Sequence, residues 1–283
     1  MKRFQCTFLL FLMLAFSCEE VVKIDTGVLE ERVIIEGQVI NASDLSYVKI
    51  TRSRDFYAQG PAERVSDALV EVVINSSQTV TFVHNPAGDP LLEGYYIPIG
   101  DFIGRVGDVY QLTVNVDEVT YQATEQMKPV TAIDSLTSRF NEGEFEDPEV
   151  PGRYFNVLLN AEEPQETEDR YLFKFYRNDT LLRDFPTDVY VAQDELLGDR
   201  IAELEIPGFY SVNDLVRVEM YSLTQEAFIF YSDLANLING DGGMFSPPPA
   251  NPRNNLDNGA LGYFQVSALN MDEVIVYDPR EED

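Results

Sequence analysis

The sequence predicts a mainly β protein: two antiparallel β-sandwiches of Ig-like or transthyretin-like type, the second carrying one amphipathic α-helix. Short segments rich in Val, Ile, Thr and Tyr follow one another closely, and turn-forming residues separate them. One segment instead repeats its apolar residues at the helical period. The length of 283 residues suits one large domain or two ordinary ones.

The first domain is predicted over residues 32–127. Its clearest strand is Tyr110 to Val116, in which every second residue is apolar and shares one face of the strand. The turn Asn75 to Ser77 joins two strands into a hairpin. Strands are expected over residues 33–40, 47–51, 68–74, 79–83, 94–98, 110–116 and 120–124.

The second domain is predicted over residues 128–278, after a boundary at Met127 to Val130, and a charged tail follows over 279–283. Strands are expected over residues 154–160, 171–177, 215–221 and 262–268. The acidic stretch Glu142 to Glu149 is expected to form a loop.

A helix is predicted near residues 224–239. Thr224 suits its N-cap, Glu226 complements the helix dipole, and Gly240 suits its end. We expect its apolar stripe to pack on a sheet, although a face that binds a partner is the alternative. The stripe consists of Ala227, Phe230, Tyr231, Leu234, Leu237 and Ile238.

Residues 1–17 are interpreted as an export signal. Lys2 and Arg3 precede an apolar run from Phe8 to Phe16, which is too short to span a bilayer. The small Ser17 and then Cys18 follow, a layout similar to the loose lipoprotein boxes of the Bacteroidota. We therefore expect Cys18 to carry acyl chains, which anchor a protein stably when there are several, and residues 18–31 to be a tether. An ordinary cleaved signal is the alternative.

Glu19 and Glu20 follow that cysteine and resemble the surface-export signal of Bacteroidota lipoproteins. The resemblance implies an outer-membrane protein that faces the cell exterior. The alternative is that both glutamates merely begin a solvated tether.

Charge and cysteine content exclude several classes of function. The formal net charge is −29, which repels nucleic acid and anionic membrane surfaces. Of the two cysteines, Cys6 leaves with the signal and Cys18 is used for lipid, so neither a disulfide nor a thiol nucleophile is expected. His84 is the only histidine and lies in a turn-rich loop, where we expect it to be solvated. Zinc sites of Cys and His, and triads that need Cys or two His, are excluded.

One loop of this acidic chain combines basic and aromatic residues. Such a patch could bind a carboxylate-bearing ligand or a partner protein. The alternative is a solvated loop balanced by Asp55, Glu63 and Asp67. The candidate residues are Arg52, Arg54, Phe56, Tyr57 and Arg64.

Two further segments have a functional and a structural interpretation. Asn239 to Gly243 is faintly similar to a calcium loop, but Ala250 stands where an EF-hand has glutamate, so we expect a helix stop and no metal. The proline-rich segment Phe245 to Asn255 could be a docked recognition strap. We expect it instead to connect the helix with the last strand.

Several short motifs together resemble an uncharacterised family of Bacteroidota lipoproteins, domain of unknown function 4249, over nearly the whole mature chain. The two most specific are Pro248-Pro249-Ala250-Asn251 and Gly259-Ala260-Leu261-Gly262-Tyr263-Phe264. The others are Ile34 to Gly37, Thr51-Arg52-Ser53 with Phe56-Tyr57, Val65 to Ala68, Ile133 to Leu136, and Ser222-Leu223-Thr224 with Glu226-Ala227. The resemblance identifies no catalytic residues. It implies that the protein is a companion of a TonB-dependent outer-membrane receptor.

The resulting expectation is a surface-exposed outer-membrane lipoprotein without enzymatic activity and without a cofactor other than the lipid on Cys18. It would serve a TonB-dependent transporter as an accessory or binding subunit. The alternative is a structural or adhesive envelope protein that binds other surface proteins or glycans. An enzyme acting on surface polymers is a third hypothesis, for which no specific carboxylate pair can be named.

Overall fold

The structure, a computed structural model, describes residues 30–54, 58, 60–141, 152–162, 168–183, 189–193, 200–240 and 250–281. The chain divides into two compact units. The first comprises residues 1–30 and 54–60, of which only Glu30, Arg54, Ala58 and Gly60 are described. The second comprises residues 31–53 and 61–283 and contains every strand and helix named below.

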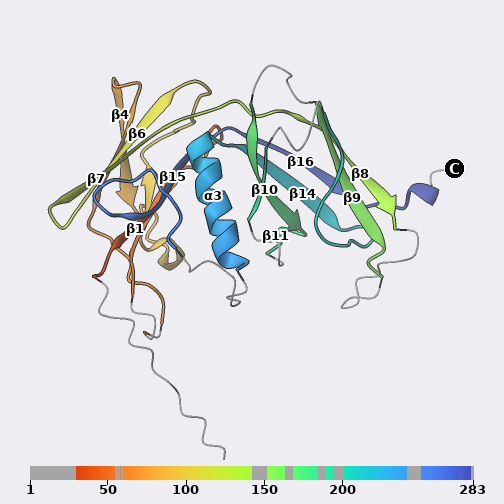
Figure 1. Ribbon diagram of the computed structural model, residues 1–283, viewed down its shortest axis with the longest axis horizontal. Coiled ribbons are helices and arrows are strands. Elements are labelled where there is room, and N and C mark those ends of the chain that lie inside the picture. The colour runs from red at the N-terminus through yellow and green to blue at the C-terminus, as the bar shows by residue number, and fades with distance from the viewer. Residues whose placement is uncertain are drawn as a thin grey trace, which may run out of the picture. The chain divides into compact units, whose positions relative to one another are not determined.

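An eight-stranded sheet forms the N-terminal part of the second unit (Figure 1). Its strands are ordered β15-β1-β2-β5-β4-β3-β6-β7, and every neighbouring pair is antiparallel except β1 with β15. The bounds are β1 Val33–Ile40, β2 Tyr47–Arg52, β3 Leu69–Ile74, β4 Gln78–His84, β5 Tyr95–Pro98, β6 Val109–Val116, β7 Val119–Gln126 and β15 Leu261–Ser267.

This sheet curls until its two end strands meet, so that it nearly closes into a barrel. No ladder joins β7 to β15; the loop before β15 spans the gap instead. The Asp257 carboxylate accepts a hydrogen bond from the Gln122 backbone N–H at 2.6 Å, and the Asn258 amide donates to the Thr120 carbonyl at 2.7 Å. Side chains from alternate positions fill the interior, among them Ile35, Val72, Leu112 and Phe264.

Two smaller sheets pack around a second apolar core. One has the order β13-β9-β8, with β8 Ile133–Phe140, β9 Phe155–Glu162 and β13 Arg200–Glu205. The other has the order β11-β10-β14-β16, with β12 also paired to β10. Its bounds are β10 Arg170–Arg177, β11 Thr180–Leu181, β12 Tyr190–Gln193, β14 Leu215–Ser222 and β16 Leu269–Ile275.

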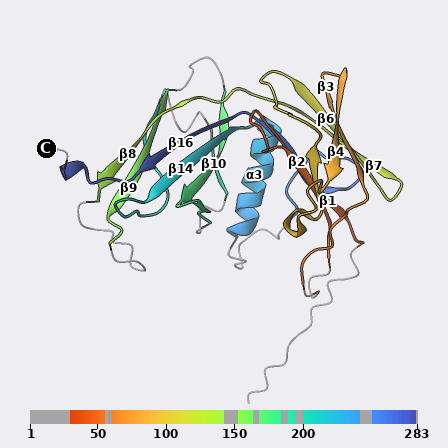
Figure 2. The same ribbon diagram turned by 180° about the vertical axis from the view of Figure 1, so that it is seen from behind.

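The described residues include one α-helix, α3 (Gln225–Ile238), and two short 3-10 turns, η1 (Pro90–Leu92) and η2 (Pro279–Glu281). As predicted, Thr224 caps α3, its hydroxyl oxygen accepting from the Ala227 N–H at 3.2 Å. Ala227, Phe230 and Tyr231 pack against Leu172, Tyr221 and Tyr263. The predicted stripe does not stay buried, because Leu237 and Ile238 at the end of α3 are exposed. Both ribbon views show α3 beside β10 (Figures 1 and 2).

The prediction of a mainly β fold is confirmed, and the predicted amphipathic helix is present as α3 in the described part of the chain, whereas the pair of Ig-like or transthyretin-like sandwiches is not confirmed. The first strands belong to one curled sheet, and β15 returns from the C-terminal region to pair with β1. The predicted domain boundary at residues 127 and 128 stays a prediction. The acidic loop 142–149 and Pro247 to Pro249 lie outside the described residues.

Candidate functional site

The predicted basic and aromatic loop is described only in part. Arg52 forms ion pairs with Asp117, with Glu31 at 3.3 Å and with Glu63 at 3.7 Å. The hydrogen bond to Asp117 raises the pKa of Arg52, because it stabilises the charged guanidinium. The charge of Arg52 is therefore balanced by three carboxylates of the same unit.

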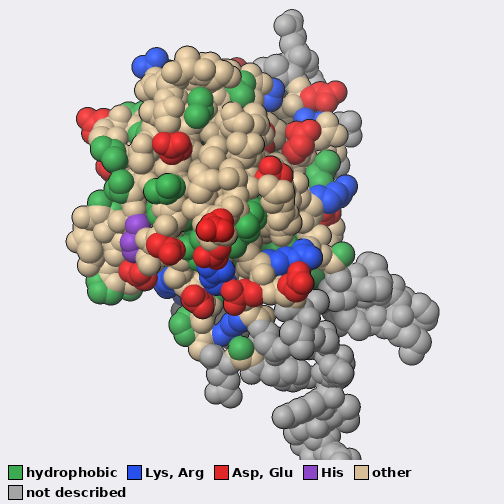
Figure 3. All heavy atoms as spheres, turned by 90° about the vertical axis from the view of Figure 1, so that its left-hand side faces the viewer, with side chains coloured by type: hydrophobic (Ala, Val, Ile, Leu, Met, Phe, Trp, Pro, Cys, Tyr) green, Lys and Arg blue, Asp and Glu red, His purple; other side chains and the backbone are tan. Residues whose placement is uncertain are grey.

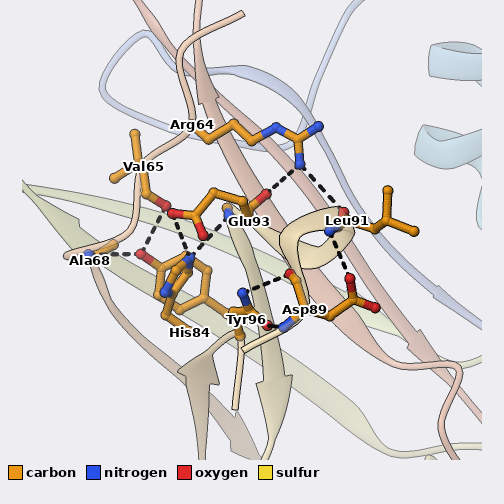
Figure 4. Close-up of polar contacts among 10 residues, drawn as sticks. Arg64, Val65, Ala68, His84, Asp89, Leu91, Glu93 and Tyr96 are labelled. Carbon is orange, nitrogen blue, oxygen red and sulfur yellow. Dashed lines mark hydrogen bonds and ion pairs between the residues drawn. The ribbon is translucent and has the colours of Figure 1, made fainter. Parts of the chain in front are cut away.

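Arg64 lies close to Arg52, because an isolated bridge joins it to Thr51. One guanidinium nitrogen of Arg64 donates to the backbone oxygen of Glu93 at 2.7 Å and, at 3.4 Å, to that of Leu91 (Figure 4). Arg64 thus holds the turn before β5. Arg54 is exposed in the other unit, and Phe56 and Tyr57 lie outside the described residues, so the five-residue patch stays a prediction. Cys18, Glu19 and Glu20 also lie outside them.

His84 lies at the end of β4, at the same corner (Figure 4). Its Nε2 accepts a hydrogen bond from the Gly94 backbone N–H at 3.0 Å. A Glu93 carboxylate oxygen lies 3.6 Å from the same nitrogen and would form an ion pair only with a protonated ring. His84 is therefore partly buried and hydrogen-bonded rather than freely solvated as expected.

Tyr96 on β5 also lies at this corner. Its hydroxyl accepts from the Ala68 N–H at 2.9 Å and donates to the Val65 carbonyl at 3.1 Å, and its ring lies 5.3 Å from the His84 ring (Figure 4). The hydroxyl therefore satisfies backbone groups just before β3. Side-chain hydrogen bonds therefore hold the backbone at this corner, beyond the end of the β3–β4 ladder.

A cavity of about 290 Å³ opens beside His84, where β3 and β4 separate. Pairing between these strands ends at Val70 and Phe82. Beyond that pair, Leu69 is paired with Asn115 on β6 and Val83 with Ile97 on β5. The cavity is lined by apolar and polar side chains together, notably Leu69, Glu71, Thr81, Val83, His84 and Asn115.

Figure 3 shows the outer face of the eight-stranded sheet, with acidic side chains close to the histidine and apolar side chains scattered over it. Leu69, the first residue of β3, is 70% exposed. The sequence run Ala68-Leu69-Val70 could have revealed this exposed apolar side chain. Side chains alternate between the two faces of a strand, so three consecutive apolar residues in the predicted strand place at least one on the outer face. Sequence reasoning missed this cavity.

A second polar cluster lies on β10 and β14. Glu219 accepts hydrogen bonds from the Tyr176 hydroxyl at 3.0 Å and the Tyr221 hydroxyl at 2.7 Å. The Lys174 ammonium lies over the Tyr221 ring, 4.6 Å from its centre, and the Arg217 guanidinium lies 4.2 Å from the centre of the Tyr176 ring. The strand register explains this set, because Lys174 faces Glu219 and Tyr176 faces Arg217.

Burial perturbs the pKa values in this cluster. It lowers the pKa of Lys174, and together with the Glu219 charge it raises the pKa of Tyr176 to about 12. Perturbed groups can mark active sites. Here, however, Glu219 already accepts two hydroxyls, and both cations lie on aromatic rings, so the contacts favour a structural role. Among the described residues, no group of three or more His, Cys, Asp and Glu is arranged to hold a metal ion.

A family model described as Domain of unknown function (DUF4249) matches residues 19–271. The chain belongs to this family. No curated protein matches it.

In this DUF4249 chain, the Gly259 to Phe264 motif forms the edge of the barrel seam. Gly262 has φ +97°, and a Cβ atom there would lie 2.1 Å from the Ile35 carbonyl oxygen, so glycine alone fits. Tyr263 donates to the buried Glu125, and Phe264 fills the barrel interior. The motif thus contributes to barrel closure.

None of the described helices is long and apolar enough to cross a bilayer.

Proposed function

We propose that this DUF4249 protein is a lipid-anchored binding protein of the outer membrane that faces the cell exterior. In this role it serves a TonB-dependent transporter as a non-enzymatic accessory subunit. The observation that carries the proposal is Cys18, which follows a short apolar run and precedes Glu19 and Glu20. The family resemblance also supports the proposal, because it implies that members are companions of TonB-dependent receptors.

The packing of the barrel supports binding at the outer surface. Side chains such as Val72, Leu112 and Phe264 fill the interior of the curled sheet, as in other small barrels. The described cavity lies between β3 and β4. A partner or cargo is therefore expected to meet the outer face of the sheet.

Labelling of growing cells with radioactive palmitate tests the anchor. The wild-type protein should incorporate label and fractionate with the outer membrane, and Cys18→Ser should do neither. Protease added to intact cells should degrade the wild-type protein. Recovery of the wild-type protein only from the inner membrane would refute the proposed location.

The second candidate is a structural or adhesive envelope protein that binds surface proteins or glycans. The extended outer face of the eight-stranded sheet favours it, because such a face can also dock other envelope proteins. A deletion strain separates the two. Loss of uptake of one nutrient supports the transporter role, whereas intact uptake with altered adhesion supports the second candidate.

A further inference from the structure

We propose that the cavity between β3 and β4 receives an apolar side chain of a partner protein, and that basic residues flank this side chain. The inference deepens the proposed function, since it rests on a binding role for the protein and adds the chemistry of the partner. It concerns the outer face of the eight-stranded sheet and not the predicted loop around Arg52.

The volume of the cavity suits one anchoring side chain. Its volume of about 290 Å³ is near the lower end for ligand pockets, which run from about 300 Å³ upward. Anchor residues that fill such pockets carry much of the binding energy of protein interfaces. A cavity of this size holds one large apolar side chain.

Exposed or half-buried apolar side chains lie beside the cavity on three neighbouring strands. Leu69 on β3 is 70% exposed, and Val83 on β4 is directly paired with Ile97 on β5. Strand alternation places these three residues on the outer face, because Val70, Phe82 and Tyr96 beside them are buried in the core. Ile99, bonded through its N–H to the Thr81 carbonyl, extends the apolar surface and is 62% exposed.

The charge around the cavity indicates the charge of the partner segment that would bind there. The lining includes the exposed carboxylate Glu71 and no lysine or arginine. The whole chain has a formal net charge of −29. A basic segment is therefore attracted, and an acidic segment is repelled. Lysine or arginine on either side of the anchor would lie near Glu71.

Fluorescence anisotropy of labelled peptides with the purified full chain tests the inference. The probes are Lys-Lys-Phe-Lys-Lys, Lys-Lys-Ser-Lys-Lys and Glu-Glu-Phe-Glu-Glu. The basic phenylalanine peptide should bind at least about fivefold more tightly than the serine peptide, because an anchor side chain contributes about 1 kcal/mol or more. The acidic peptide should bind most weakly of the three.

Substitutions locate the site. Leu69→Ala should reduce the preference for phenylalanine over serine, and its matched control Ile275→Ala, 60% exposed on β16, should not. Glu71→Gln should weaken both basic peptides by about two- to fivefold, the range of an exposed charge pair. The control Glu273→Gln, an exposed strand carboxylate on β16, should leave binding unchanged.

Three results overturn the inference: equal binding of the phenylalanine and serine peptides, equal effects of the β3 and β16 variants, or preference for the acidic peptide. Circular dichroism of each variant checks that it is folded. Because the assay needs no transporter, its failure is distinct from failure of the proposed function. If the peptides bind as expected but no barrel partner is found, the inference about the cavity stands and the proposed transporter role is refuted.

Discussion

Tyr263 donates its hydroxyl hydrogen to Glu125 across the barrel seam, with the two oxygens 2.6 Å apart. Tyr263 comes from β15 and Glu125 from β7, the two end strands of the eight-stranded sheet. The Asn255 amide donates to the same carboxylate at 3.3 Å and to the Phe264 carbonyl at 2.9 Å. Side-chain hydrogen bonds thus replace a backbone ladder at the last gap of the barrel.

The first prediction concerns the pH dependence of this seam. Burial raises the pKa of Glu125 above its usual value of 4.5, so the folded state binds the proton more tightly than the unfolded state. Its contribution to stability is complete below the unfolded pKa and is lost as pH rises through the folded pKa. Glu125→Gln removes this contribution.

Urea unfolding of both proteins from pH 4 to pH 8 measures the effect. Relative to wild type, the free energy of unfolding of Glu125→Gln should rise with increasing pH. Glu118→Gln, in the exposed β6–β7 turn, is the control and should follow wild type. A pH-independent difference between Glu125→Gln and wild type would contradict the assignment.

The second prediction concerns the glycines of the family motif. Gly262→Ala should destabilise the fold by about 3 kcal/mol or more, because the added Cβ meets the Ile35 backbone and the φ of +97° is strained. Gly259→Ala should cost only about 1 kcal/mol, because its φ is +77° but nothing lies near its added Cβ. Thermal and urea unfolding compare the two; equal losses would contradict this account of the motif.

The third prediction concerns Glu219. Glu219→Gln should lower the pKa of Lys174 further, because the Glu219 charge opposes the effect of burial on that lysine. The same change should bring the pKa of Tyr176 down from about 12. NMR titration of the lysine Cε and tyrosine Cζ signals measures both. Unchanged titration of Lys174 would show that the two residues are not electrostatically coupled.

The fourth prediction concerns the cap of α3. Thr224→Ala should reduce the free energy of unfolding by about 1 kcal/mol, because the Ala227 N–H loses its acceptor. Thr224→Ser keeps the hydroxyl and should retain most of that stability. If both variants lose equal stability in urea unfolding, the threonine methyl group rather than the cap is responsible.

Local sequence patterns predicted most of the first sheet. Alternation at Tyr110 to Val116 and the hairpin around Asn75 were confirmed as β6 and the β3–β4 turn, since both depend on neighbours in the chain. The parallel pairing of β15 with β1 joins residues more than 200 positions apart, and no local pattern encodes it. This pairing places β15 in the first sheet, whereas the sequence assigned that strand to the second domain.

Strands with weak alternation were missed. The register of β13 shifts between Ile201 and Leu204, and β16 exposes both Met271 and Ile275. Burial does not alternate along β13, and in β16 it alternates but the exposed positions include the apolar Met271 and Ile275 while the polar Asp272 is half-buried. Neither sequence therefore shows the apolar and polar alternation that identifies a half-buried strand. The β3–β4 cavity was missed for a related reason: it depends on where the β3–β4 ladder ends, and beyond Val70 and Phe82 the two strands pair with β6 and β5 instead.

Purification of the lipidated protein from its native outer membrane in mild detergent, followed by mass spectrometry, tests whether this protein is a subunit of a TonB-dependent transporter. Cys18→Ser, expressed at the same level, controls for association after lysis. We expect a TonB-dependent barrel to be recovered in a fixed stoichiometric ratio with the wild-type protein and to be lost with Cys18→Ser. A correctly lipidated, surface-exposed protein that is recovered alone would contradict the accessory role.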